Sequence, residues 1–100
     1  MDAETSAFNE MIHAPHRLRI CAMLSAAHKV EFQHLQDHLG LSKSALSKHL
    51  TQLADAGYVR QDRATRDLRS RVWLSLTPEG ARAYSAHVRA LRQIVAADGS

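Results

Sequence analysis

The sequence predicts a mainly α-helical fold with a small β-hairpin (α+β), and three observations support this class. Apolar residues recur at helical spacing in several segments that are separated by short turns. Apolar and polar residues alternate over residues 71–76, as in a half-buried strand. The 100 residues include 4 glycines and 2 prolines, too few for an all-β fold with many tight turns.

The charge of the chain is concentrated in one region. The length suits a single domain over residues 1–100, and a hydrophobic content of 45% is enough for a core. The formal net charge is +3. Residues 42–71 hold seven basic and three acidic side chains, a net +4, so the rest of the chain sums to −1. A basic region of this kind favours an anionic partner.

The cysteine count and the hydropathy favour a cytoplasmic protein. Cys21 is the single cysteine, so the chain has no internal disulfide and suits a reducing compartment. No apolar run approaches the roughly 20 residues of a membrane span, and we expect no membrane contact. The opening residues MDAETSAFNE are acidic and polar, unlike a signal peptide.

Two helices are expected before residue 28. Apolar residues at helical spacing predict a short amphipathic helix over residues 3–13. Pro15 either ends this helix or begins the next one, where a missing N–H costs nothing. Residues 16–27 are rich in Leu, Ile, Met and Ala and predict a core helix.

The segment 31–57 predicts two helices joined by a tight turn. The first ends at Gly40, which suits the left-handed residue after a helix, and Ser42 is a good N-cap for the second. The second helix runs over residues 43–56 and ends before Gly57. Its expected buried stripe is Leu46, Leu50 and Leu53. Two helices in this order form a helix-turn-helix.

A β-hairpin is expected directly after the helix-turn-helix. Residues 58–60 and 71–76 are β-like, and the polar, arginine-rich residues 61–70 are expected to form the link between them. Val30 could add a third short strand. A hairpin in this place is a wing, so the core over residues 14–76 is predicted to be a winged helix-turn-helix.

The last helix is expected over residues 78–97. Thr77 is a good N-cap, and Pro78 suits the first helical position. An apolar stripe on this helix exceeds what a small winged helix covers alone, so we expect the helices over 3–13 and 78–97 to form a homodimer interface. The expected interface residues are Phe8, Met11, Ile12, Tyr84, Val88, Leu91, Ile94 and Val95.

These segments resemble the bacterial MarR and ArsR winged-helix transcriptional regulators. The resemblance lies in SKSALSKHLTQLADAGYV, which is similar to the recognition helix and the following strand, and in PHRLRICAML, which is similar to the first helix. DLRSRVWLSLTPEGARAY is similar to the MarR-type wing and the start of the last helix, and Asp67-Leu68-Arg69 matches the D-x-R of that wing. The likeness covers about residues 12–85, with the elements in order.

The resemblance implies a homodimeric DNA-binding regulator, with repression as the default mode, on a (pseudo)palindromic operator in double-stranded DNA. It assigns base or phosphate contacts to Ser42, Lys43, Ser44, Ser47 and Lys48, and the role of the wing arginine to Arg69. The exposed face of this helix is rich in Ser and Thr, which are poor helix formers, and this favours DNA contact over a merely solvated face. The expected contacts of the recognition helix are Ser42, Lys43, Ser44, Ser47, Lys48, His49 and Thr51. Those of the wing are Arg63, Arg66, Arg69 and Arg71, because a narrow minor groove attracts arginine.

Two other readings remain open at this point. Some winged helices serve only as protein–protein interaction modules. Alternatively, the protein could be an effector-gated sensor, with Cys21 as a redox receiver or the pair His34 and His38 as a metal receiver. We expect no metal and no cofactor, and the sequence points to no particular effector. Nor does it contain a nucleophile with a base or a phosphate-binding glycine loop, so we expect no enzymatic activity.

Overall fold

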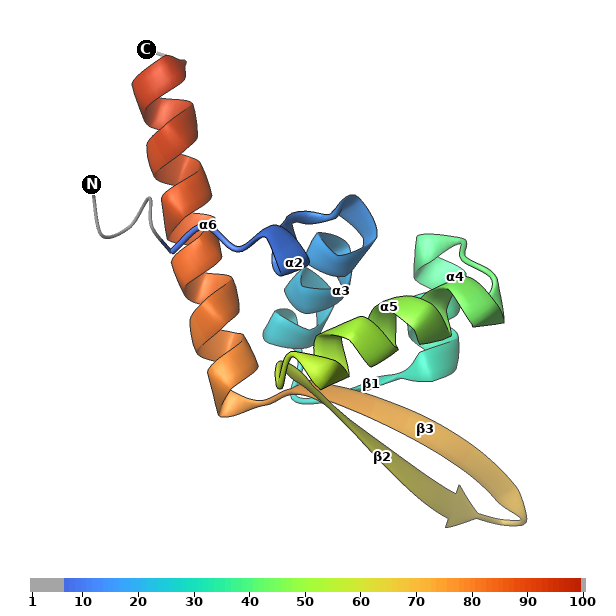
Figure 1. Ribbon diagram of the computed structural model, residues 1–100. Coiled ribbons are helices and arrows are strands. Elements are labelled where there is room, and N and C mark those ends of the chain that lie inside the picture. Colours follow the sequence, from blue (N-terminus) through green and yellow to red (C-terminus); the bar gives the residue numbers. More distant parts are fainter. Residues whose placement is uncertain (1–6, 100) are drawn as a thin grey trace.

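The computed structural model describes residues 7–99, which form a winged helix (Figure 1). The helices are α2 (Glu10–His13), α3 (Pro15–Ala26), α4 (Phe32–Leu39), α5 (Lys43–Asp55) and α6 (Pro78–Asp98). The strands are β1 (Val30–Glu31), β2 (Val59–Arg66) and β3 (Arg69–Leu76), in the antiparallel order β1-β3-β2. The mainly helical class with a small sheet is confirmed.

The core lies between α3, α4, α5 and the base of the sheet. Leu46, Leu50 and Leu53 on α5 are at most 3% exposed, as the sequence predicted. They pack with Leu35 of α4 and Leu74 of β3, both of which are fully buried. Burying each such leucine contributes roughly 1.5–3 kcal/mol. This packing fixes the rotation of α5 about its own axis.

The turn between α4 and α5 has the predicted caps. Gly40 lies in the left-handed region at φ 66°, and its N–H donates to the carbonyl of Gln36 at 2.9 Å. The Ser42 hydroxyl accepts a hydrogen bond from the N–H of Ala45 at 3.1 Å and so caps α5.

The hairpin is longer and more regular than expected. Residues 61–70, predicted as a polar link, belong almost wholly to β2 and β3, which pair without interruption from Val59–Leu76 to Arg66–Arg69. Asp67 and Leu68 alone form the turn, both at positive φ (51° and 64°), the pattern of a type I′ hairpin turn. The strands had no apolar–polar alternation to predict them because this part of the hairpin is exposed on both faces.

The expected N-terminal helix over residues 3–13 is wrong in its extent. Residues 3–6 lie outside the described part of the chain, and residues 7–9 are not helical. The helix begins only at Glu10 because Asn9 is extended and its side-chain oxygen accepts the N–H of Ile12 at 3.0 Å. Pro15 then begins α3, which decides between the two roles considered for it.

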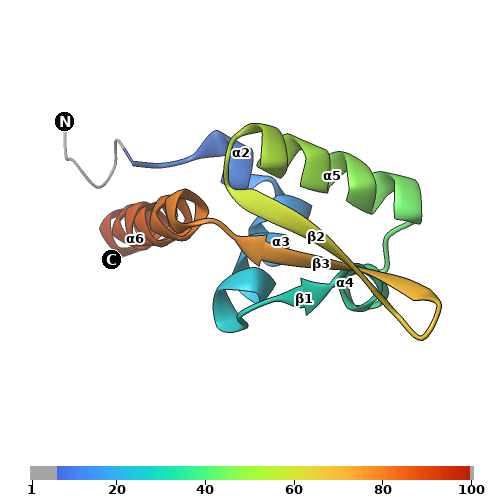
Figure 2. The same cartoon turned by 90° about the horizontal axis from the view of Figure 1, so that it is seen from below.

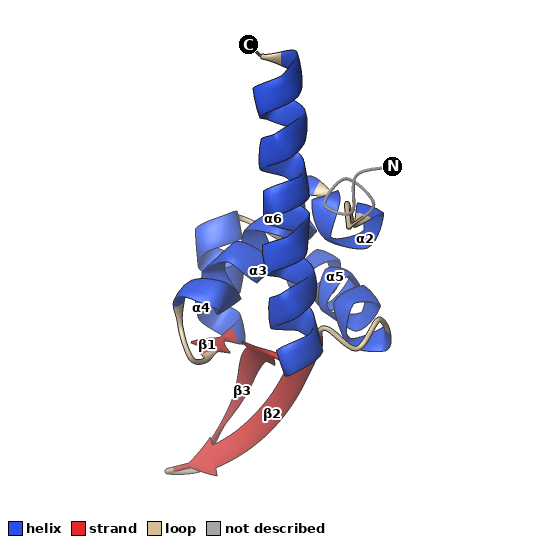
Figure 3. Ribbon diagram, turned by 90° about the vertical axis from the view of Figure 1, so that its left-hand side faces the viewer, coloured by secondary structure: helices blue, strands red, loops and turns tan. Residues whose placement is uncertain are grey.

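The joint between the hairpin and α6 is tied by Thr77. Its hydroxyl accepts the N–H of Gly80 at 2.9 Å and donates to the carbonyl of Gly57 at 2.6 Å, and its own N–H donates to the carbonyl of Tyr58 at 3.0 Å. From this joint α6 rises past α2 and α3, and its C-terminal half projects beyond them (Figures 1 and 3). The principal extents of 54 × 26 × 21 Å reflect this projection.

A buried histidine joins the N-terminal segment to α6. His87 is fully buried, and its Nδ1 accepts the backbone N–H of Asn9 at 2.9 Å. The ring proton must therefore lie on Nε2, which faces Nδ1 of His13 at 3.3 Å. The ring of Phe8 packs 4.6 Å from the ring of His87 and 4.7 Å from that of His13, measured between centroids. These contacts hold the segment before α2 against α6.

Replacing Gly80 with alanine is expected to destabilise the protein. A glycine-to-alanine change inside a helix normally stabilises it by about 1 kcal/mol. Here the added Cβ would fall on the carbonyl oxygen of Tyr58 and within 2.8 Å of its carbonyl carbon, so the sign reverses. We expect the free energy of unfolding in urea to fall by about 1–3 kcal/mol. Ser85→Ala, at an exposed position of the same helix, is the matched control, and equal stability of Gly80→Ala and wild type would contradict the prediction.

Lowering the pH is expected to destabilise the protein through His87, which joins the segment before α2 to α6. Burial, reinforced by His13, lowers the pKa of His87 below its ordinary value of 6.5. The unfolded chain binds the proton more readily than the folded protein. The contribution of the neutral His87 ring to the free energy of unfolding is therefore complete above the unfolded pKa, and it is lost as pH falls below about 6.5 toward the folded pKa. His87→Asn retains an acceptor for the Asn9 N–H but does not titrate. Urea unfolding between pH 8 and pH 5 should therefore show a shallower loss for the variant, and equal slopes would contradict this.

Candidate nucleic-acid interface

The exposed face of α5 is polar and short-chained. With the three leucines held in the core, Lys43, Ser44, Ser47, Lys48 and Thr51 are all exposed, on the part of α5 that turns away from the core. The first-turn residues Lys43 and Ser44 follow the Ser42 cap, where backbone N–H groups and the helix dipole favour anions. Six of the seven predicted contacts of the recognition helix thus lie on one accessible surface.

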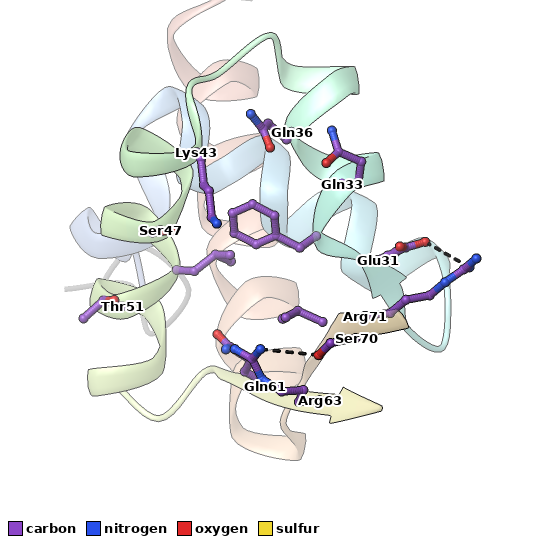
Figure 4. Close-up of a pocket in the computed structure, with 13 residues that line it drawn as sticks. Glu31, Gln33, Gln36, Lys43, Ser47, Thr51, Gln61, Arg63, Ser70 and Arg71 are labelled. Atoms are coloured by element: carbon purple, nitrogen blue, oxygen red, sulfur yellow. Dashed lines mark hydrogen bonds and ion pairs between the residues drawn. The ribbon is translucent and has the colours of Figure 1, made fainter. Parts of the chain in front are cut away.

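A groove separates α5 from the hairpin. Its volume is about 530 Å³, and α4, α5, β2 and β3 all contribute to its walls (Figure 4). Lys43 and Ser47 come from α5, Arg63 from β2 and Arg71 from β3. The floor is apolar and consists of Phe32, Leu50 and Val72. Cationic and hydroxyl side chains around an apolar floor suit a nucleic-acid strand, whose phosphates are charged and whose sugars are less polar.

Three glutamines of this groove were missed in the sequence. Gln33 and Gln36 on α4 and Gln61 on β2 line it with amides that can bond phosphate oxygens. Gln33 already donates to Asp37 at 2.9 Å. Nothing in the sequence marked them, because a glutamine on the polar side of a helix is ordinary and Gln61 falls in the segment that was expected to be a polar link. Only the fold places α4 opposite the hairpin.

The hairpin has two faces, and the predicted wing arginines are divided between them. In register with Val59 and Leu76, Gln61 and Arg63 alternate onto the inner face, which adjoins the groove beside α5. Arg66, Arg69 and Trp73 point to the opposite, outer face, where they line a separate hollow together with Arg71. Figure 2 shows α5 on one side of the hairpin only.

His49 faces the core of the protein more than the outer surface of α5. Its Nδ1 lies 3.3 Å from a guanidinium nitrogen of Arg17, and its ring is 5.4 Å from the ring of His16. Arg17 also donates to the side chain of Gln52 at 2.9 Å and to the carbonyl of Met11 at 2.6 Å. Burial, followed by the charge of Arg17, lowers the pKa of His49 and favours the neutral ring. This geometry braces α5 against α3.

The residues expected at a dimer interface fall into two groups. Tyr84, Val88, Leu91 and Ile94 are half-buried along α6, and Val95 is 62% exposed. By contrast, Ile12 is fully buried in the core of its own protomer, and Met11 packs against that core. Ile12 therefore has no surface to offer a partner, which corrects its expected place in the interface. Met11 and Ile12 instead complete the core of their own protomer beneath α6.

The structure gives no support to the residues considered as sensors of an oxidant or a metal, which are Cys21 and the pair His34 and His38. Cys21 is fully buried, and burial raises the pKa of its thiol to about 11 against the opposing charge of Arg17, which disfavours the reactive thiolate. His34 and His38 have ring centroids 6.3 Å apart. Within residues 7–99, no group of three or more His, Cys, Asp or Glu side chains could hold a metal ion. No helix in this part of the chain is long and apolar enough to cross a membrane.

The helix-turn-helix, the hairpin beside it and the cationic groove define a winged-helix DNA-binding protein. The sequence profile of the family described as "Winged helix DNA-binding domain" matches residues 16–95, and the chain belongs to this family. The resemblance to MarR-type winged-helix regulators is confirmed. The comparison with curated proteins gives no match.

Several solved structures of transcriptional regulators have the same fold. A transcriptional regulator homologue from Pyrococcus horikoshii OT3 is 24% identical, with a TM-score of 0.84 over 89% of this chain and 88% of that one. NadR in complex with 4-hydroxyphenylacetate is 26% identical, with a TM-score of 0.71 over 96% and 68%. PcaV from Streptomyces coelicolor, in complex with its natural ligand, is 22% identical, with a TM-score of 0.69 over 91% and 66%. This chain spans only about two thirds of NadR and of PcaV, so both of those proteins are longer than it.

Removing the cation of the inner face is expected to weaken DNA binding without changing sequence preference. Arg63 lies in the groove and donates to Ser70 at 3.4 Å, an exposed contact that leaves it available to a phosphate. Arg63→Ala should reduce the slope of log affinity against log salt by about 0.9 for each bound copy of the protein, the value for one lost phosphate contact. Fluorescence anisotropy at several salt concentrations measures it. Arg92→Gln, an exposed cation on the distal half of α6, is the control, and an unchanged slope for Arg63→Ala would exclude this contact.

Proposed function

We propose that the protein is a sequence-specific transcriptional repressor that binds a (pseudo)palindromic operator as a homodimer. The single observation that carries the proposal is the exposed hydroxyl and lysine face of α5, fixed beside a cationic groove. A helix with side chains is about 10–12 Å across, and the major groove of B-DNA is about 12 Å wide. α5 has 13 residues, or about 20 Å, and enters the major groove with this face toward the bases.

The residues of α5 divide between reading bases and binding phosphates. Ser44, Ser47 and Thr51 carry hydroxyls that both donate and accept, and Lys48 donates to guanine. Ser42 and Lys43 stand at the N-terminus of the helix and bind a phosphate there. His49 acts indirectly, by holding α5 against Arg17 and α3.

The groove and the hairpin extend this contact to the DNA backbone. The DNA strand that separates the major groove from the next minor groove runs through the protein's groove between α5 and the hairpin. Lys43, Arg63 and the glutamines line the walls there. The turn of the hairpin then reaches the minor groove, whose narrow stretches attract arginine. Arg69, directly after the turn, is the arginine that enters it.

The apolar stripe of α6 supports a homodimer. Its distal part projects beyond the core (Figure 3), and among the described residues Leu91, Ile94 and Val95 do not belong to the set that packs against the main core cluster. A second copy that packs there with two-fold symmetry would place two α5 helices on half-sites one or more helical turns apart, each turn about 34 Å. Repression then follows from occupation of the operator, which blocks polymerase.

The first experiment selects bound duplexes from a random pool and measures their affinity by anisotropy at several salt concentrations. We expect an enriched palindrome and a steep salt dependence. Ser47→Ala should change the selected bases, while Arg63→Ala should weaken all duplexes alike. Binding that is weak and uniform over all sequences would reject a sequence-specific repressor and favour a protein–protein interaction module.

Replacing Leu91 with glutamate is expected to give a monomer with poor operator affinity. The charge would be buried in the proposed interface, whereas in a monomer this half-exposed position tolerates it. Light scattering measures the mass, and circular dichroism checks that the fold is kept. Gln93→Glu, an exposed change of the same charge on the same helix, is the control. A dimer of normal mass in Leu91→Glu would remove this interface.

A further inference from the structure

The side of α5 that faces α3 carries a histidine whose protonation state is fixed by its partner. Nδ1 of His49 lies 3.3 Å from a guanidinium nitrogen of Arg17 on α3. A guanidinium has N–H donors and no acceptor, so Nδ1 must accept this hydrogen bond and the ring proton must lie on Nε2. The contact between Arg17 and His49 therefore forms only while the histidine is neutral.

Arg17 is held in place by two further hydrogen bonds. Its Nε donates to the carbonyl of Met11 in α2 at 2.6 Å, and its guanidinium donates to the side-chain oxygen of Gln52 at 2.9 Å. A second proton on His49 would place an N–H of the ring against an N–H of the guanidinium, and both groups would carry positive charge. Because Arg17 keeps its other partners, the repulsion acts on His49 and thus on α5.

Basic side chains surround the ring of His49. The ring of His16 on α3 lies 5.4 Å away, measured between centroids, and Lys48 precedes His49 on α5. Burial, followed by the charges of Arg17, His16 and Lys48, lowers the pKa of His49 below its ordinary value of 6.5. His49 is thus neutral at pH 7 and gains a second proton only as pH falls below about 6.5. The basic groups on both helices then repel it.

The contact with Arg17 lies beside the buried stripe of α5 and fixes a second side of the helix. The three leucines hold one side in the core, and Arg17 binds His49 and Gln52 on the side next to it. Ser47 and Lys48 occupy the exposed face of the same turn. Hydrogen bonds weaken steeply when they are misaligned, so a small displacement of α5 would reduce the bonds that these side chains form with base edges.

We propose that the contact between His49 and Arg17 makes operator binding sensitive to pH, so that mild acid weakens it. This inference rests on the proposed function. The neutral ring keeps α5 in the position that reads the bases. When the ring is protonated this position is populated less, and the apparent affinity falls in proportion to its population. A further positive charge on α5 would by itself attract phosphates, so weaker operator binding in acid distinguishes a displaced helix from a simple change of charge.

The test measures fluorescence anisotropy on two duplexes of equal length, the selected operator and an unrelated sequence, at constant salt between pH 8 and pH 5. The ratio of the two affinities removes the general effect of protonating exposed histidines. For wild type we expect this ratio to fall in acid by about two- to tenfold for each bound copy, the value of one hydrogen bond. His49→Asn keeps an acceptor near the position of Nδ1 but does not titrate, so its ratio should stay constant.

Two other histidine variants separate recognition from stability. His28→Asn removes an exposed histidine outside α5, and its ratio should fall as in wild type. His87→Asn removes the buried histidine that ties the segment before α2 to α6, and it should also keep the wild-type fall. Circular dichroism sets the lowest pH at which all four proteins are folded. A wild-type ratio that stays level or rises in acid would overturn the proposal, and so would a fall that persists in His49→Asn.

A measurement without DNA tests the contact itself. The nitrogen NMR shifts of the His49 ring report which nitrogen carries the proton, and at pH 8 we expect Nε2 to carry it. A proton on Nδ1 would overturn the proposal, because Arg17 could not then donate to His49. If wild type selects no operator, the proposed function fails and the inference about operator binding falls with it. The NMR measurement then still shows whether the contact requires a neutral ring, so the two failures are distinguishable.

Discussion

The packing of three leucines from α5 into the core is the constraint on which the interface depends. Leu46, Leu50 and Leu53 repeat at helical spacing and are nearly or fully buried, so the helix has one allowed rotation. That rotation decides that serines and lysines face outward. A polar surface of this kind costs helix propensity, yet α5 remains regular over 13 residues because the core fixes it. Stability and recognition are therefore properties of opposite sides of one helix.

A second constraint acts where the hairpin meets the terminal helices. The backbone of Tyr58 accepts the N–H of Thr77, its hydroxyl accepts the side-chain amide of Asn9 at 2.9 Å, and Gly80 packs against it without room for a Cβ. The root of the hairpin, the start of α6 and the N-terminal segment thus share one residue. His87 adds a further tie between that segment and α6. These contacts connect α6 to the base of the hairpin.

The paired hairpin turns one arginine-rich segment into two surfaces. If residues 61–70 were a flexible link, their arginines would not be assigned to fixed faces of the protein. As two strands in register, they place Arg63 beside α5 and Arg66 and Arg69 on the other side. The two-residue turn at positive φ makes this separation possible, since it keeps the strands paired to their ends.

The sequence alone determined the helix-turn-helix, its two caps, the start of α6 and the exposed face of α5. These depend on local periodicity and capping, as at Gly40 and Ser42, which short stretches of sequence encode. Only the tertiary structure decided the short α2, the paired hairpin, the burial of Ile12 and His87, and the inward placement of His49. The exposed strands lack a hydrophobic pattern, and the other features arise from contacts between residues far apart in the chain, such as Asn9 with His87. Sequence periodicity reports which side of an element is buried, but the partner that buries it is set by the fold.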